Sequence, residues 1–368
     1  MRIGVPKEIK NHEYRVGLTP ASVAELVHAG HSVLVETKAG MGIDFDDAAY
    51  TAVGAQIAPD AKTVFAQSDM IVKVKEPQAQ EIALLEPRHL LFTYLHLAAD
   101  KPQAEGLMKS GATCIAYETV TSNSGALPLL KPMSEVAGRM SVQVASHYLE
   151  KEQGGRGELL GGVPGVAPCK VAILGGGVSG INAAQMATGQ RADVTIYDIN
   201  NERLAELDMH FGSQIKTAYA SKAAIAEAVR TSQVVIGAVL VPGAAAPKLV
   251  TRDMLKTMMR GSVLVDIAID QGGCFETSRA TTHDDPVFEI DGVIHYCVAN
   301  MPGAVARTSA FALNNATLPF VLKLANQGAE AAMQADRHLA NGLNVSGGKI
   351  RHQAVADALD LPFEAWAG

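Results

Sequence analysis

The stretch 170-KVAILGGGVSGINAAQMATGQRADVTIYD-198 decides the fold of this chain. An apolar run rich in β-branched residues, Lys170 to Leu174, leads directly into the pattern Gly175-x-Gly177-x-x-Gly180. A helical pattern follows, and a second apolar strand from Val194 to Tyr197 comes after it. This order of strand, glycine turn, helix and strand is the fingerprint of a dinucleotide-binding βαβ unit.

Each part of the motif has a mechanical reason. Gly175 allows a tight turn, Gly177 lets a pyrophosphate approach the backbone, and Gly180 lets the helix pack closely on the strand. The first N–H groups of the helix and the positive end of its dipole then hold the phosphates. Asp198 ends the second strand, where a carboxylate accepts hydrogen bonds from the ribose hydroxyls. The sequence predicts dinucleotide binding, and the alternative is a glycine-rich turn without a ligand.

The overall composition indicates a globular α/β protein. A chain of 368 residues with 48% hydrophobic and 19% charged residues is long enough for two domains with large cores. A net charge of −7 without a basic block argues against nucleic-acid binding. With no membrane-length apolar run and no signal-peptide pattern, we expect a cytoplasmic protein. The widely spaced cysteines are expected to be buried, reduced thiols: Cys114, Cys169, Cys274 and Cys297.

The order of elements predicts two α/β halves. Residues 1–128 alternate β-like runs with helical patterns, which is typical of a mostly parallel sheet. The segment Ser134–Glu150 predicts a long connecting helix with Ser134 as its N-cap. Residues 153–168 are rich in Gly and Pro and predict a loop. From Cys169 to about residue 300 a second α/β pattern predicts five or six parallel strands.

The chain turns helical again from about Arg307 to Ala340, and this segment can return to the first half. We therefore expect an α/β fold with two Rossmann-like domains joined by long helices, with an interdomain cleft. The expected substrate or catalytic domain is discontinuous, with residues 1–128 and 307–368. The expected Rossmann NAD-binding domain comprises residues 129–306.

Three polar residues of the first half follow predicted strands. Arg15 lies in the loop after the first strand, while Lys75 and His96 end the strands MIVKVK and LLFTYLH. Ligand groups collect at the carboxyl ends of parallel strands. Arg suits a bidentate carboxylate contact, Lys supplies a point charge, and His transfers protons near neutral pH. The trio predicts a site for a substrate carboxylate, against the alternative of a solvated Arg, an edge Lys and a structural His.

The second half contains two acids whose roles the residues alone leave open. In VLVDIAIDQGG, Asp266 ends a predicted strand and can simply cap the next turn, whereas Asp270 precedes a glycine loop that can face the cofactor. The run Val234–Gly243 ends in a Pro-Gly turn that can press on a nicotinamide, or it is only a central strand and turn. The histidines lack metal-ligand spacing, so no metal is expected. P-loop and GxSxG patterns are also lacking.

Longer motifs resemble the alanine dehydrogenase family: MRIGVPKEIKNHEYRVGLTP, KVKEP, YLHLA, KPMSEVAGRM, GAVLVPGAAAPKLV, VDIAIDQGGCFE and YCVANMPGAV. The resemblance runs from Met1 to about residue 365. The chain resembles more weakly the NAD-binding part of proton-translocating transhydrogenase, which needs membrane segments and a partner domain.

The resemblance implies NAD-dependent, reversible oxidative deamination of L-alanine to pyruvate and ammonium, by a homohexamer. It implies that Arg15 and Lys75 bind the substrate carboxylate and that His96 and Asp270 carry the proton chemistry. It implies cofactor contacts at Ser134, Gly175, Gly177, Val178, Gly180, Asp198, Arg203, Val239, Leu240, Ile267, Ala268, Ile269, Asp270, Arg279, Val298, Ala299, Asn300 and Met301.

The chain departs from the family pattern at two positions. Ala220 stands where the family often has Ser, and Ser221 is then the substitute for one adenine-side hydrogen bond. Gly176 stands where the family has Ala.

Two alternative functions are kept beside the family resemblance. One is a transhydrogenase-like binding module that docks a membrane partner. The other is a regulatory NAD sensor whose first domain has lost catalysis.

Overall fold

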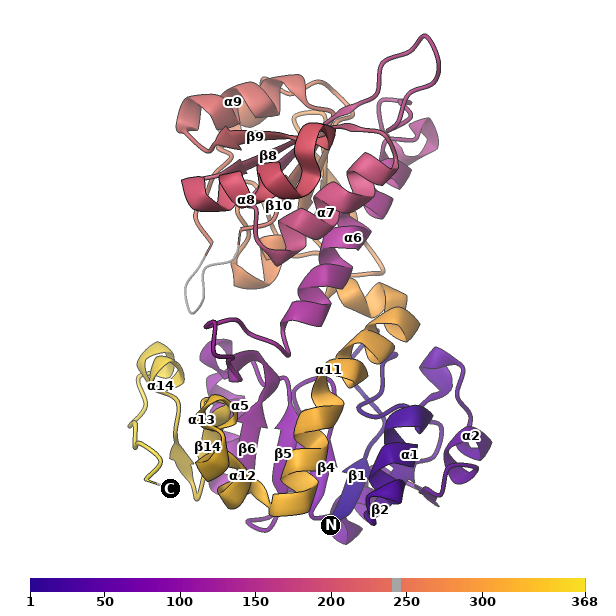
Figure 1. Cartoon of the computed structure of the whole chain (residues 1–368), viewed down its shortest axis with the longest axis vertical. Helices are drawn as coiled ribbons and strands as arrows, with labels where there is room; N and C mark the ends of the chain where they lie inside the picture. Colours follow the sequence, from indigo (N-terminus) through magenta and orange to yellow (C-terminus); the bar gives the residue numbers. More distant parts are fainter. Residues whose placement is uncertain (240–245, 368) are drawn as a thin grey trace. The chain divides into compact units, whose positions relative to one another are not determined.

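The computed structural model describes residues 1–239 and 246–367. The chain divides into two compact units, Met1–Met133 with Val305–Gly368, and Ser134–Ala304. Figure 1 shows the indigo N-terminal and yellow C-terminal segments within one unit. The sequence-based division placed the two boundaries after residues 128 and 306, whereas the compact units divide after residues 133 and 304. Among the described residues, no helix is long and apolar enough to cross a membrane.

The first unit is built on an eight-stranded sheet, counted over the described residues, in the order β15-β14-β6-β5-β4-β1-β2-β3. The N-terminal strands pair in parallel, and the two C-terminal strands are antiparallel. The strands are β1 Arg2–Val5, β2 Ser32–Glu36, β3 Gln56–Ala58, β4 Met70–Val72, β5 Leu90–Thr93, β6 Thr113–Ala116, β14 Leu343–Ser346 and β15 Lys349–Ile350. The mostly parallel sheet expected from residues 1–128 is confirmed.

Helices of the first unit begin at the positions that their capping residues indicate. Thr19, Asp46, Asp60 and Asp100 each accept a hydrogen bond from a backbone N–H of the following first turn. The helices are α1 Pro20–His28, α2 Asp47–Thr51, α3 Ala61–Gln67, α4 Ala79–Ile82, α5 Lys101–Ser110, α11 Ala306–Gln327, α12 Ala329–Ala335, α13 Arg337–Ala340 and α14 Gln353–Leu359. Short 3₁₀ turns follow β5 and β6: η2 Leu97–Ala99 and η3 Tyr117–Thr119.

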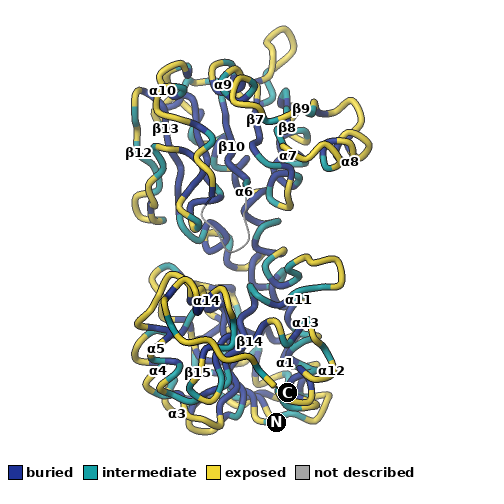
Figure 2. Tube along the Cα trace, turned by 90° about the vertical axis from the view of Figure 1, so that its left-hand side faces the viewer, coloured by how far each residue is buried: buried dark blue, intermediate teal, exposed yellow. Residues whose placement is uncertain are grey.

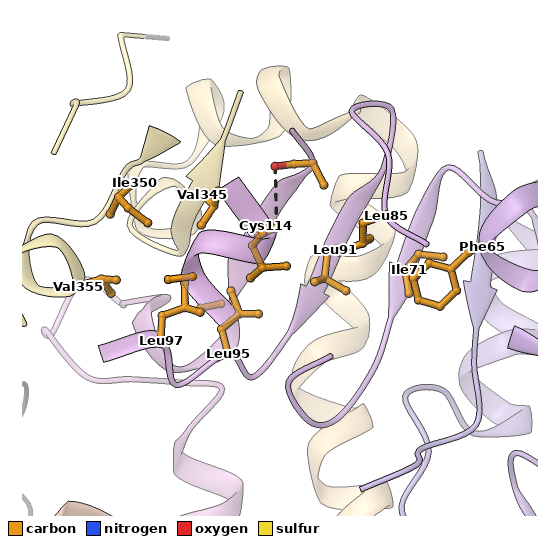
Figure 3. Packing of buried hydrophobic residues seen from close by; sticks show 14 of the residues in the cluster. Phe65, Ile71, Leu85, Leu91, Leu95, Leu97, Cys114, Val345, Ile350 and Val355 are labelled. Atoms are coloured by element: carbon orange, nitrogen blue, oxygen red, sulfur yellow. Dashed lines mark hydrogen bonds between the residues drawn. The ribbon is translucent and has the colours of Figure 1, made fainter. Parts of the chain in front are cut away.

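The C-terminal segment completes the core of the first unit. Figure 3 shows Val345, Ile350 and Val355 packed with side chains of the parallel strands and of the turn after β5. Leu95 and Leu97 belong to this cluster and are almost fully buried. Because burial of apolar surface is the main driving force of folding, residues 343–359 stabilise the turn after β5.

The second unit is built on a seven-stranded sheet of the described residues, in the order β12-β13-β11-β10-β7-β8-β9. All neighbours are parallel except the edge pair β12 and β13. The strands are β7 Lys170–Leu174, β8 Asp193–Asp198, β9 Lys216–Tyr219, β10 Val234–Gly237, β11 Val263–Asp266, β12 Val287–Ile290 and β13 Val293–Tyr296. The helices are α6 Lys131–Tyr148, which begins in the first unit, α7 Val178–Gly189, α8 Asn201–Phe211, α9 Lys222–Thr231 and α10 Arg252–Leu255.

The structure corrects several sequence expectations. Helix α6 begins at Lys131, so the expected N-cap role of Ser134 is wrong. Pro132 is tolerated in the first turn of a helix, where its missing N–H has no helical partner, so the helix starts upstream of Ser134. Strands β4 and β5 end at Val72 and Thr93, and therefore Lys75 and His96 lie beyond the strands instead of ending them. Elements β3, β12, β14, β15 and α14 were not expected at all.

Burial follows the sheets of both units, as the dark blue strands and yellow loops of Figure 2 show. The four cysteines are free and buried, as expected. Burial raises the pKa of the thiol of Cys114 and that of Cys297 to about 12, and that of Cys169 to about 11. Neutral thiols of this kind are inert as nucleophiles.

A buried histidine in the second unit makes its stability depend on pH. His295 is fully buried in β13, stacks on Phe288, contacts the carbonyl oxygen of Val293 through Nδ1 and lies 2.8 Å from the Thr277 hydroxyl through Nε2. Burial lowers the pKa of His295 from 6.5 to about 4. The unfolded chain therefore takes up a proton near pH 6.5, which the folded chain does not bind until about pH 4.

We predict that the free energy of unfolding falls as the pH decreases from 6.5 towards 4, by at most about 3 kcal/mol from this residue. The substitution His295→Gln removes this part of the slope, although it also lowers stability at pH 7 through lost packing. Urea unfolding followed by circular dichroism at several pH values measures the slope. His210→Gln, on the exposed face of α8, is the control and should keep the wild-type slope. An unchanged slope in His295→Gln contradicts the prediction.

Candidate active site

The glycine turn after β7 has the geometry that phosphate binding requires. Gly175 has a φ of +105°, and a Cβ there would lie 2.8 Å from the carbonyl oxygen of Ala238. A Cβ on Gly180 would collide with the carbonyl oxygen of Gly175, whereas a Cβ on Gly177 would meet no atom within 4 Å. The turn is therefore tightly packed at Gly175 and Gly180 and open at Gly177, the N-cap of α7. An anion can approach the first N–H groups of α7, which begins at the partly exposed Val178.

Asp198 and Arg203 flank the same turn. The Asp198 carboxylate accepts hydrogen bonds from the backbone N–H of Gly176 at 2.8 Å and of Asn200 at 2.9 Å. Arg203 donates to the carbonyl oxygen of Gly176 at 2.6 Å and forms an ion pair with Glu206 at 2.7 Å. The carboxylate is therefore held at the end of β8, and Glu206 offsets the charge of Arg203.

Asp266 and Asp270, the two acids of the second unit, differ in burial. Asp266 is fully buried and accepts hydrogen bonds from the N–H of Ala268 at 3.1 Å, the N–H of Cys274 at 2.9 Å and the hydroxyl of Ser278 at 2.5 Å. Burial raises the pKa of Asp266 in spite of these bonds. Asp266 thus caps the 3₁₀ turn η6, Ile267–Gln271, and also closes the loop behind it. Asp270 lies on this turn and is exposed, so it is the acid available to a ligand.

The sheet order brings most of the expected cofactor residues to one edge. Strands β13, β11, β10, β7 and β8 are neighbours, and their carboxyl ends carry Val298–Met301, Ile267–Asp270, Val239, the glycine turn and Asp198. Arg279 is exposed and lies over the ring of Phe288 at 4.2 Å, on the β12 side. Leu240 lies outside the described residues.

Ser134 and the adenine-side serine have specific positions. Ser134 is half-buried in the first turn of α6, one turn before Gly138, where a Cβ would collide with the carbonyl oxygen of Ser179 in α7. This close approach places the start of α6 against the start of α7. The hydroxyl oxygen of Ser221 caps α9 by accepting from the N–H of Ala224 at 3.2 Å. In this contact the Ser221 hydroxyl accepts, so that it can still donate its hydrogen in place of a serine at position 220.

In the first unit, Arg15 is buried and bound to an acid that the sequence analysis missed. Its Nε and Nη2 donate to the two carboxylate oxygens of Glu13 at 2.7 and 2.5 Å, and its Nη1 lies 3.0 Å from Sδ of Met133. Burial alone raises the pKa of Glu13, but the hydrogen bonds and charge of Arg15 outweigh this effect and keep it below its ordinary value. The fork of Arg15 is therefore fixed in one orientation.

Lys75 and His96 lie beside this pair. Strands β1, β4 and β5, which precede Arg15, Lys75 and His96, are neighbours in the sheet. Electrostatic interactions link Lys75 to Glu13, and Arg15 to the phenol of Tyr94. The ring of Tyr94 in turn stacks on that of His96, with 5.6 Å between centroids. The structure thus brings together the three residues that the sequence analysis grouped.

His96 is exposed between two buried anchors. Leu95 and Leu97 insert into the core of the first unit, as Figure 3 shows, and the backbone at His96 is left-handed with a φ of +51°. The carboxylate of Glu118 accepts a hydrogen bond from the N–H of His96 at 2.6 Å. The imidazole therefore stands on a rigid turn and faces outwards. Glu118 carries no local sequence signal, because it lies 22 residues from His96 in the chain. Glu13 and Tyr94 lie two residues from their partners Arg15 and His96, but their residue types at this spacing are too common to distinguish them.

The fold and the two sites define a two-unit α/β protein of the Rossmann type, with a phosphate-binding turn in one unit and a cationic, histidine-containing cluster in the other. The chain belongs to the alanine dehydrogenase/PNT family. The model described as "Alanine dehydrogenase/PNT, N-terminal domain" matches residues 4–137, and the C-terminal domain model matches residues 141–353.

Individual relatives match this chain over nearly its full length. The chain is 59% identical to an alanine dehydrogenase of Halomonas elongata, over 99% of this chain and 98% of that protein. A solved structure of L-alanine dehydrogenase matches with a TM-score of 0.95 and 54% identity, covering 98% of this chain and 99% of that chain. A transhydrogenase from Sinorhizobium meliloti matches with a TM-score of 0.84 and 25% identity, covering 95% and 100%.

We predict that two glycine substitutions in the phosphate-binding turn differ in their effect on the free energy of unfolding. Gly180→Ala forces the start of α7 away from β7, and it should lower the free energy of unfolding by about 1–3 kcal/mol. Gly177→Ala meets no neighbouring atom and should change stability by less than about 1 kcal/mol.

The methyl group of Gly177→Ala would, however, stand where a pyrophosphate approaches, and NADH binding should weaken. Urea unfolding and NADH fluorescence titration of both variants measure the two effects. Equal stability of both variants would contradict the packing argument, and unchanged NADH binding in Gly177→Ala would contradict the assignment of the turn.

Proposed function

We propose that this chain is an NAD-dependent alanine dehydrogenase, which converts L-alanine to pyruvate and ammonium and catalyses the reverse reaction. The observation that carries the proposal is the presence of Arg15, Lys75 and His96 in one cluster of a chain that is 59% identical to an alanine dehydrogenase. The substrates in this proposal, L-alanine, pyruvate and ammonium, are small molecules. A homohexamer and a cytoplasmic location are proposed from the resemblance alone.

Arg15 and Lys75 bind the substrate carboxylate in this proposal. Arg15 is held by Glu13, so that little side-chain entropy remains to be lost when a carboxylate binds. Its Nη1 contacts the thioether of Met133, which is a weak acceptor, and a substrate carboxylate gives a stronger, charge-assisted bond there. Lys75 adds a second positive charge, with its ammonium 3.5 Å from Glu76.

Proton transfer is assigned to His96, and the family resemblance implies that Asp270 takes part in it. Bound NAD would supply the acceptor for the hydride of Cα, and alanine with its amino group unprotonated would thereby become an iminium ion. His96 takes a proton from the water that adds to this carbon and returns it to the nitrogen of the carbinolamine. As the C–N bond breaks and ammonia leaves, His96 accepts the proton of the remaining hydroxyl, which becomes the keto oxygen of pyruvate. Proton transfer by a positioned side chain contributes about 10²–10⁴-fold in rate.

The residues of the second unit fit NAD. The open backbone at Gly177 accommodates a pyrophosphate, and the carboxylate of Asp198 is available to the ribose hydroxyls. Arg203 is paired with Glu206 and hydrogen-bonded to Gly176, so that it is not aimed at a 2′-phosphate. The other cofactor contacts implied by the family, including Leu240, are proposed with these residues.

The activity is tested by adding L-alanine and NAD and following NADH absorbance, with pyruvate, ammonium and NADH for the reverse reaction. His96→Ala and Asp270→Asn should each abolish most turnover and leave the fold and NADH binding largely intact. The double variant should be hardly worse than the slower single variant, because groups that act as a unit are not additive.

Full turnover in His96→Ala would make His96 a structural residue. A wild-type chain that binds NADH but reduces no NAD with alanine would instead favour a transhydrogenase-like binding module or a regulatory NAD sensor. A panel of amino acids in the same assay measures how strictly alanine is preferred.

We predict that the wild-type chain prefers NAD to NADP. A carboxylate at Asp198 repels a 2′-phosphate and accepts hydrogen bonds from a free ribose hydroxyl. The variant Asp198→Ala should raise KM for NAD and narrow the ratio of kcat/KM between the two cofactors. Glu206→Gln, which removes the partner of Arg203 but leaves Asp198 intact, is the control for the local charge. Comparable wild-type use of NADP would show that Asp198 does not select the cofactor.

A further inference from the structure

Three charged side chains are buried together beside the backbone segment that carries Lys75. The ammonium of Lys73 lies 3.0 Å from a carboxylate oxygen of Glu8 and 2.7 Å from one of Glu81. The three side chains are 0%, 2% and 2% exposed. Charges this deep are costly unless they are paired and hydrogen-bonded, and the carboxylates of Glu8 and Glu81 provide the partners of Lys73.

The two acids of this group differ in their second contact. Glu8 uses its other oxygen, Oε1, to accept hydrogen bonds from the backbone N–H of Val74 at 2.6 Å and of Lys75 at 3.4 Å. Glu81 uses its other oxygen to accept from the N–H of Gln78 at 2.8 Å, at the start of α4. Glu8 therefore ties the buried ammonium to the backbone of Lys75, whereas Glu81 ties it to a helix.

The strand order explains why the backbone at Lys75 needs a side-chain partner. Strand β1 pairs with β4 through Ile3 and Gly4, but β1 ends at Val5 and Pro6 follows. The chain after β4 continues beyond that end, so β1 offers no further acceptors to it. The carboxylate of Glu8 supplies acceptors in their place.

The neighbouring β5 side of this segment is also held. The N–H of Tyr94 donates to the carbonyl oxygen of Val74 at 3.2 Å, and the hydroxyl of Thr93 donates to that of Lys75 at 3.0 Å. The backbone from which Lys75 extends is thus fixed by Glu8 through its N–H groups and by β5 through its carbonyl groups.

We propose that Glu8 is a positioning residue for Lys75: anchored on the buried Lys73, it holds the backbone from which Lys75 reaches the substrate carboxylate. Glu8 acts through Lys75 and does not touch the substrate. The inference rests on the proposed function, because the role of Lys75 as a carboxylate ligand belongs to that proposal.

The test compares Glu8→Gln with Glu81→Gln. Each substitution removes one of the two carboxylate charges that face the Lys73 ammonium, at nearly constant side-chain volume. Both variants should therefore have a lower melting temperature. In Glu8→Gln the amide group faces the Lys73 ammonium as one donor against another, and the side chain cannot serve Lys73 and the N–H groups together. We expect KM for pyruvate to rise about tenfold, the size of one lost hydrogen bond of about 1.4 kcal/mol.

In Glu81→Gln, KM for pyruvate should stay near the wild-type value. The dissociation constant for NADH should be unchanged in both variants. Equal KM values in the two variants would overturn the proposal, since the buried charge alone would then explain the effect. A loss of NADH binding confined to Glu8→Gln would also overturn it.

A double-mutant cycle with Lys75→Ala separates positioning from a general structural role. If Glu8 acts through Lys75, adding Glu8→Gln to Lys75→Ala should not raise KM for pyruvate any further. A further tenfold rise would show that Glu8 acts independently of Lys75. If Glu8→Gln does not fold, Glu8→Asp keeps the charge but is shorter by one methylene group; KM must rise there too, and a wild-type KM overturns the proposal.

The proposed function fails in a different way. If the wild-type chain forms no NADH from L-alanine and NAD, the function is wrong whatever the variants do. If the wild type is active and the variants behave alike, the positioning role of Glu8 is wrong and the function stands.

Discussion

Parallel pairing of neighbouring strands is the constraint on which both candidate sites depend. In the first unit β5, β4 and β1 end at one edge of the sheet, and the segments that follow them carry His96, Lys75 and Arg15. In the second unit β13, β11, β10, β7 and β8 do the same for the glycine turn and the segments around it. Residues far apart in the chain become neighbours because the strands before them are hydrogen-bonded.

Charge burial then converts these neighbours into defined geometry. The guanidinium of Arg15 is held by Glu13, and Lys73 is held by Glu8 and Glu81. Isolated charges at such depth would be strongly destabilising, so each cation needs its acid and is oriented by it. The ion pairs that offset the free-energy cost of burying these cations also fix the positions of their positive charges. Asp266 follows this logic in the second unit, where it orders the turn that carries Asp270.

Features with local causes were predictable from the sequence. The glycine spacing located β7 and α7, because an apolar run that leads into a glycine turn leaves little choice. The start of α6 was misplaced, since Pro132 is compatible with a first helical turn and Ser134 only resembles a cap. The strands near the C-terminus were missed because both are short and because β14, with which β15 pairs, is itself paired with β6, more than two hundred residues earlier in the chain.

The acids around the cationic cluster were missed for a different reason. In KEIKNHEYR, Glu8 and Glu13 look like any solvated carboxylates, and no spacing distinguishes them. Their environment arises only when β4 lies beside β1, which buries Glu8 against Lys73 and leaves the N–H groups of Val74 and Lys75 to be satisfied. Strand β1 ends at Val5 and does not extend beside these N–H groups, and the carboxylate of Glu8 accepts their hydrogen bonds instead. The length of β1 thereby determines which acid supports a lysine that lies beyond the end of β4.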